Sequence, residues 1–87
     1  MKTIETYYLG PTNRRGARIK ARETDGKYII RSLDDSLSIE GNHRKIATEL
    51  RDKMQWKEPM QGGHTEMGMV WVFVDPYYRI EGQNGNN

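Results

Sequence analysis

The sequence predicts an α+β domain in which four strands form a mainly antiparallel sheet and one helix packs on a face of that sheet. Three observations support this prediction. The first third of the chain holds β-prone segments separated by turn residues, the middle holds one amphipathic stretch, and an apolar run follows near the end. The chain has 87 residues, enough for one small core, and the predicted element order is β-β-β-α-β.

Three strands are expected in the first 33 residues. Residues 3–9 (TIETYYL) are rich in Thr, Ile and Tyr, which favour strands. Residues 17–23 (ARIKARE) alternate between apolar and charged side chains, a pattern typical of a strand with one buried face, and residues 27–33 (KYIIRSL) supply the third strand. The intervening GPTNRRG and the Asp-Gly pair of TDGK are turn sequences, so the three strands are predicted to form an antiparallel meander.

The remaining elements are one helix and one strand. Over residues 39–54 the apolar positions recur on one face at 3.6 residues per turn, and Ser38 is the expected N-cap. Residues 56–68 contain Pro59 and three glycines and are predicted to be a loop, whereas residues 69–75 (MVWVFVD) form the strongest strand. We therefore expect a single domain over residues 1–76 and a flexible tail over 77–87, which has little to bury.

Few residues of this chain suit catalysis or metal binding. No cysteine is present, which excludes disulfides and thiolate metal sites, and no phosphate-binding or nucleophile motif occurs. His43 lies on the apolar stripe of the predicted helix, where a packed histidine bonded to a polar group is favoured over a catalytic base. His64 is expected to be exposed in a loop, and with His43 and Glu66 it matches no known ligand spacing. We therefore predict a protein that is not an enzyme and has no cofactor or metal.

The charge distribution points to binding. The net charge is only +2, but residues 1–33 carry eight basic and three acidic side chains, whereas residues 34–87 carry six basic and nine acidic ones. The basic side chains of the first hairpin form a stripe that suits phosphates or an acidic protein patch, with a tyrosine on the adjoining strand as a stacking surface. The predicted partner-binding residues are Arg14, Arg15, Arg18, Lys20, Arg22, Tyr7 and Tyr8. The competing interpretation is a solvated, charge-protected sheet face.

Two segments, YLGPTNRRGARIKAR (8–22) and NHRKIATELRDKMQW (42–56), resemble a family of small, largely uncharacterised proteins of phages, prophages and plasmids. That family shows a YLGPTNxRGxRIKA-like segment, a helix with an HRxAA-like start and a KMGW-like end, a Gly-Gly loop and a YVFVF-like strand. The matching residues cover about three quarters of the chain and depart from the pattern at Gln55, where a glycine is usual. The resemblance implies a mobile-element origin, and by analogy a protein that sabotages a host process by stoichiometric binding.

The function predicted from these observations is inhibition of a host defence complex, in the manner of an anti-CRISPR protein, by stoichiometric protein binding. The expected partner is a host protein or ribonucleoprotein complex in the bacterial cytoplasm, with no membrane involved, since no run approaches the roughly 20 apolar residues of a membrane span. The alternative is a small nucleic-acid-binding regulator that uses the same basic hairpin directly. A small homodimer paired through an edge strand is a third possibility, so the expected state is a monomer or a homodimer.

Overall fold

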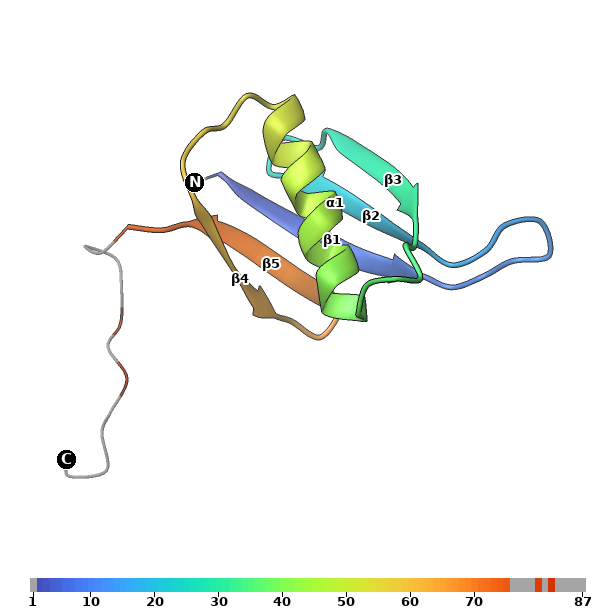
Figure 1. The fold of residues 1–87 in the computed structure, drawn as a ribbon. Helices are drawn as coiled ribbons and strands as arrows, with labels where there is room; N and C mark the ends of the chain where they lie inside the picture. Colours follow the sequence, from blue (N-terminus) through green and yellow to red (C-terminus); the bar gives the residue numbers. More distant parts are fainter. Residues whose placement is uncertain (1, 76–79, 81, 83–87) are drawn as a thin grey trace.

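The computed structural model describes residues 2–75, 80 and 82, which contain a five-stranded antiparallel sheet with one helix across one of its faces (Figure 1). The α+β class and the single helix predicted from the sequence are confirmed. The sheet order is β3-β2-β1-β5-β4, and every neighbouring pair is antiparallel. The strands are β1 (Thr3–Leu9), β2 (Arg18–Glu23), β3 (Tyr28–Ser32), β4 (Met60–His64) and β5 (Gly68–Phe73), and the helix is α1 (Ile39–Lys53).

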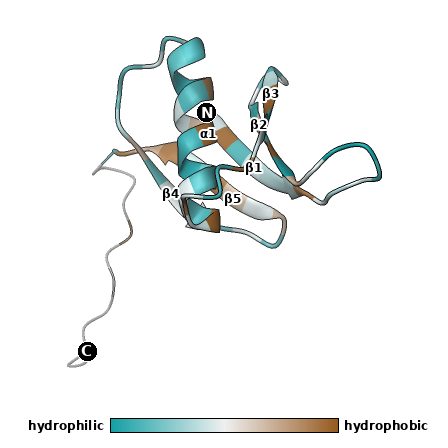
Figure 2. Cartoon of the chain, turned by 45° about the vertical axis from the view of Figure 1, so that its right-hand side comes forward, coloured by the Kyte–Doolittle hydropathy of each residue, from teal (hydrophilic) through white to brown (hydrophobic). Residues whose placement is uncertain are grey.

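The core lies between α1 and one face of the central strands. Because successive strand residues point to opposite faces, Ile4, Ile19 and Ala21 all point toward the helix, and each is fully buried. Ile46 and Leu50 of α1 pack against them, so the alternation of ARIKARE and the helical stripe meet in one cluster. Figure 2 shows the opposite, solvent side of α1 as hydrophilic, as expected for a helix that buries one stripe.

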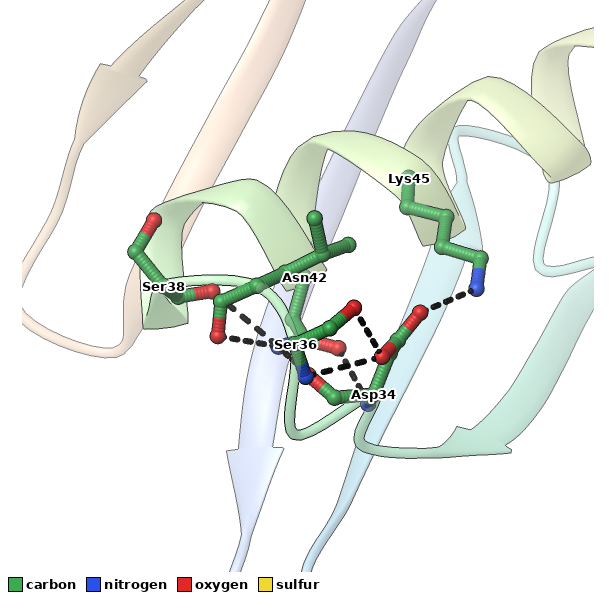
Figure 3. A network of polar contacts seen from close by, with 6 residues as sticks. Asp34, Ser36, Ser38, Asn42 and Lys45 are labelled. Carbon is green, nitrogen blue, oxygen red and sulfur yellow. Dashed lines mark hydrogen bonds and ion pairs between the residues drawn. The ribbon is translucent and has the colours of Figure 1, made fainter.

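Helix α1 begins where its capping residue predicts. The Ser38 hydroxyl accepts a hydrogen bond from the Gly41 N–H at 3.0 Å. Asn42 is 3 % exposed and joins the helix to the loop after β3: its Oδ1 accepts the Asp34 N–H at 2.7 Å, and its Nδ2 donates to the Asp34 carbonyl at 3.0 Å (Figure 3). The Asp34 carboxylate in turn accepts a hydrogen bond from the Ser36 hydroxyl and pairs with Lys45. This network fixes the direction in which the chain enters the helix.

The predicted number of strands was wrong by one. Residues 56–68 were expected to be a loop, but Met60–His64 form β4, paired along its length with β5. Of the two glycines that argue against a strand, Gly62 has a packing role here, because a Cβ at this position would stand 2.5 Å from the Trp71 ring. The pairing with β5 defines β4, and Gly62 leaves the room that the Trp71 ring occupies beside it.

The ends of the other strands agree with the predictions to within two residues, and β1 agrees fully. The predicted flexible tail, residues 77–87, lies mostly outside the described residues, as does the domain end at 76. No helix of the described part is long and apolar enough to span a membrane.

Candidate functional site

The most distinctive surface of the protein is the sheet face opposite α1, which we call the open face. Within the described residues no helix or loop covers it. The register places the side chains of this face in rows that run across the strands. In one row Tyr7 stands beside Lys20 and Ile30, in the next Glu5 stands beside Arg22 and Tyr28, and in a third Leu9 stands beside Arg18 and Ser32. The face thus mixes cations, the carboxylate of Glu5, aromatic rings and aliphatic side chains.

Cations and aromatic rings of the open face touch one another. The Lys20 ammonium lies 4.4 Å from the centre of the Tyr28 ring, a cation–π contact, and Tyr28 is 54 % exposed. The Tyr7 hydroxyl donates a hydrogen bond to Glu5 at 2.8 Å, and this bond raises the pKa of the Tyr7 phenol. Both rings are held by a charged neighbour, which orients them before any partner arrives.

Among the basic residues of the open face, Arg18 has a side-chain N–H group that makes no hydrogen bond with the described residues. Its Nε is buried, yet none of the described residues supplies an acceptor for it. A buried donor without a partner costs about 1–3 kcal/mol, so such groups are uncommon in folded proteins.

The loop between β1 and β2 carries the remaining basic residues of the predicted site. It projects beyond the end of the sheet (Figure 1), and Figure 2 shows its outer part as hydrophilic. Thr12 organises the loop, because its hydroxyl accepts the N–H groups of Arg14 and Arg15 at 3.3 and 3.1 Å, while its own N–H donates to the Arg15 carbonyl at 2.8 Å. Arg14 and Arg15 are both exposed there, so they extend the basic surface past the sheet edge.

The structure brings together most, but not all, of the residues predicted to bind a partner. Arg18, Lys20, Arg22 and Tyr7 share the open face. Tyr8 points to the helix side, as its pairing with buried Ile19 shows. Tyr28 was missed as a site residue, although its position two strands from Tyr7 follows once the meander is drawn with Arg22 opposite Tyr28. The signal was therefore the pairing of the second and third strands across the Asp-Gly turn, which sets Tyr28 opposite Arg22.

Tyr8 belongs instead to a second exposed surface, which we call the apolar end. Thr6 pairs with Met69 and contacts His43, so the end of β1, the start of β5 and the first turns of α1 meet at one end of the molecule (Figure 1). Exposed apolar side chains gather on these segments. They are Tyr8 (50 % exposed), Leu37 (40 %), Ile39 (44 %) and Met67 (71 %).

His43 is a packed core residue, as predicted. It is 5 % exposed, and its Nδ1 lies 2.7 Å from the Thr6 hydroxyl, which also accepts the Trp71 indole N–H at 3.2 Å. The same hydroxyl donates to the Met69 carbonyl at 3.5 Å, so Thr6 links α1 to β5 through three polar contacts. Burial lowers the pKa of His43, with the Glu40 carboxylate opposing part of that shift, so the neutral ring is the folded form.

Comparisons with protein-family models, curated proteins and solved structures found no match to this chain.

Proposed function

We propose that this chain is a non-catalytic protein that binds single-stranded nucleic acid on its open face. The observation that carries the proposal is the arrangement of Tyr7, Lys20 and Tyr28 on one uncovered sheet face, with Arg18 and Arg22 in line on the same strand. Exposed aromatic rings on uncovered antiparallel sheets stack on unpaired bases in RNA-recognition modules. Nearby cations neutralise the phosphates that join those bases.

The spacing of the cations also suits an extended strand of nucleotides. Arg18, Lys20 and Arg22 alternate along β2, so their Cα atoms are separated by about 6.8 Å, a spacing comparable to that of successive phosphates in an extended chain. An unpaired strand, unlike a duplex, also leaves its bases free to stack on Tyr7 and Tyr28.

Fluorescence anisotropy with a labelled single-stranded oligonucleotide of about 12 nucleotides tests this proposal. Tyr7→Ala should weaken binding by roughly 5- to 150-fold, the range measured for loss of one stacked base. Tyr8→Ala is the matched control, because the same change is made one residue further on the opposite face, and its affinity should stay within about twofold.

The salt dependence provides an independent readout of the phosphate contacts. Replacing the three basic residues of the open face on β2 by Gln should reduce the slope of log affinity against log salt by about 2, since each single-strand contact contributes about 0.7. These residues are Arg18, Lys20 and Arg22. A control variant removes the same charge from helix α1, on the other side of the sheet, and should leave the slope unchanged. It replaces Arg44, Lys45 and Lys53 by Gln. Equal effects of the two triple variants would show that only net charge matters, and would contradict the proposal.

Inhibition of a host defence ribonucleoprotein by stoichiometric binding is a second candidate function, and the apolar end favours it. Exposed aromatic and aliphatic side chains such as Tyr8 and Ile39 are typical anchors of protein–protein interfaces. In this proposal the apolar end contacts a protein subunit, and the basic stripe contributes charge complementarity to the same complex. Such a target would lie in the cytoplasm of a bacterial host.

Affinity capture from a bacterial lysate, with and without nuclease, separates the two candidates. A defined complex that survives nuclease, is lost with Leu37→Glu and Ile39→Glu, and is retained by Tyr7→Ala supports inhibition. If such a complex is recovered and the anisotropy experiment shows no oligonucleotide binding, inhibition replaces nucleic-acid binding as the proposed function. Proteins recovered only through nucleic acid would rule out the second.

A further inference from the structure

The two edges of the sheet are protected to very different degrees. β3 at one edge carries Arg31, and Lys27 precedes it, and such charges discourage pairing with another strand. β4 at the other edge has the sequence MQGGH, without a lysine, arginine, acid or proline. An exposed edge without these features is a template for an added strand.

The ladder identifies which backbone groups of β4 are available. The Thr65 N–H donates to the Gly68 carbonyl at 2.9 Å and the Val74 N–H donates to the Pro59 carbonyl at 3.1 Å, which makes Gln61 and Gly63 the residues that bond with β5. In an antiparallel ladder the alternate residues turn their N–H and C=O groups the other way. Met60, Gly62 and His64 therefore present theirs outward from the sheet edge.

A groove of about 320 Å³ lies beside this edge, between α1 and the helix side of β4 and β5. Trp71 and Met60 form its apolar part, and Arg44, Thr48 and Arg51 line it from the helix. The Arg51 guanidinium pairs with Asp52, whereas no carboxylate of the described residues lies within ion-pair distance of Arg44. The groove is thus positively charged and has one cation available for a partner.

We propose that β4 binds an extended peptide as a sixth strand of the sheet, and that this peptide is acidic on the side that faces α1. Main-chain hydrogen bonds to Met60, Gly62 and His64 would provide the pairing, as in other cases of strand addition. Because side chains of a strand alternate, every second side chain of the peptide would point to the groove, where Arg44 favours a carboxylate. The others would point to the open-face side, beside Gln61 and Gly63, where Gly63 leaves room for aliphatic residues.

The positive charge of the groove also distinguishes a peptide from a second copy of the chain. Pairing of two β4 strands about a two-fold axis would place both grooves next to each other. Arg44 and Arg51 of one copy would then approach those of the other, and this repulsion disfavours the homodimer. This proposal rests on residues separate from the open face, so it stands or fails independently of nucleic-acid binding.

The experiment uses a capped eight-residue peptide of alternating Glu and Val as the probe, titrated into the ¹⁵N-labelled full chain. Binding should shift the amide signals of Met60, Gly62 and His64 and slow their hydrogen exchange. A peptide methylated on the backbone nitrogens that face β4 keeps the side chains but lacks the donors, and it should bind at least about tenfold more weakly. A Lys-Val peptide of the same length should also bind at least about tenfold more weakly.

Arg44→Glu should weaken binding of the Glu-Val peptide by about tenfold or more, whereas Lys53→Glu, the same charge change on the same helix outside the groove, should alter it by less than about twofold. Both side chains are exposed, so both variants should fold. The proposal is overturned if methylation has no effect, if the two charge variants behave alike, or if the peptide causes no shift up to millimolar concentration. It is also overturned if light scattering shows a dimer and the amide signals of β4 shift with protein concentration.

Discussion

At the scale of single residues, Gln55 adopts a backbone conformation that is unusual for a residue other than glycine. Gln55 directly follows Met54, the C-cap residue of α1. In the structure Gln55 has φ 61°, and its N–H bonds to the Asp52 carbonyl while the Trp56 N–H bonds to the Arg51 carbonyl. This is the Schellman arrangement that ends helices, and its left-handed residue is most often glycine because a Cβ is strained there.

Gln55→Gly is therefore expected to stabilise the protein by about 1 kcal/mol, through relief of the left-handed strain. Urea unfolding followed by circular dichroism would measure the change. Gln61→Gly, made in strand β4, should instead destabilise by about 0.5–1 kcal/mol, because there glycine only adds flexibility to the unfolded chain. A loss of stability in Gln55→Gly would mean that the Gln55 side chain makes a contact worth more than the strain.

At the scale of secondary-structure elements, the β4–β5 pair depends on the fit between a glycine and a tryptophan. The Trp71 ring lies over Gly62 and also donates its N–H to Thr6, so it joins β4, β5 and β1. The neighbouring Gly63 points to the open face, where an added Cβ would meet no atom within 4 Å. Packing therefore requires glycine at position 62, whereas position 63 has room for a side chain.

Gly62→Ala should destabilise the protein by about 1–3 kcal/mol, since the methyl group would overlap the Trp71 ring. Gly63→Ala is the matched control and should be neutral or stabilising by up to about 1 kcal/mol, because alanine loses less entropy than glycine in a strand. Chemical denaturation of both variants, with Trp fluorescence as the probe, gives the comparison. Similar stabilities for the two would show that the ring moves aside at little cost.

At the scale of the whole molecule, three groups make stability depend on pH in the same direction. The Asp25 N–H lowers the pKa of Glu23, and the Ser36 hydroxyl lowers the pKa of Asp34 to about 2. Each carboxylate contributes stability above its ordinary pKa and loses it as pH falls toward its folded value. His43, whose pKa is lowered by burial, is neutral when folded, so the unfolded chain binds its proton first and stability falls below pH 6.5.

Unfolding free energy should accordingly be highest near neutral pH and decline in two stages, one just below pH 6.5 and one below pH 4.5. His43→Gln should remove the upper stage and retain the lower one, whatever its effect on stability at pH 7. An unchanged upper stage in His43→Gln would contradict this assignment.

The prediction of elements succeeded where local signals are strong. The Ser38 cap, the helical stripe around Ile46 and Leu50, and the alternation of residues 17–23 each depend on neighbours close in sequence, and all three appear in the structure. β4 was missed because a strand of Met60–His64 exists only through pairing with β5 and through the ring of Trp71. Local propensity contains neither of these long-range interactions.

The candidate site divides in the same way. The sequence by itself determined that Arg18, Lys20 and Arg22 share one side of a strand, because side-chain direction alternates with a period of two residues. Only the tertiary structure decided that this side is the uncovered one, that Tyr7 joins it while Tyr8 faces away, and that Tyr28 lies against Lys20. The physical reason is that register and the choice of covered face follow from packing between segments distant in the chain, which no local pattern specifies.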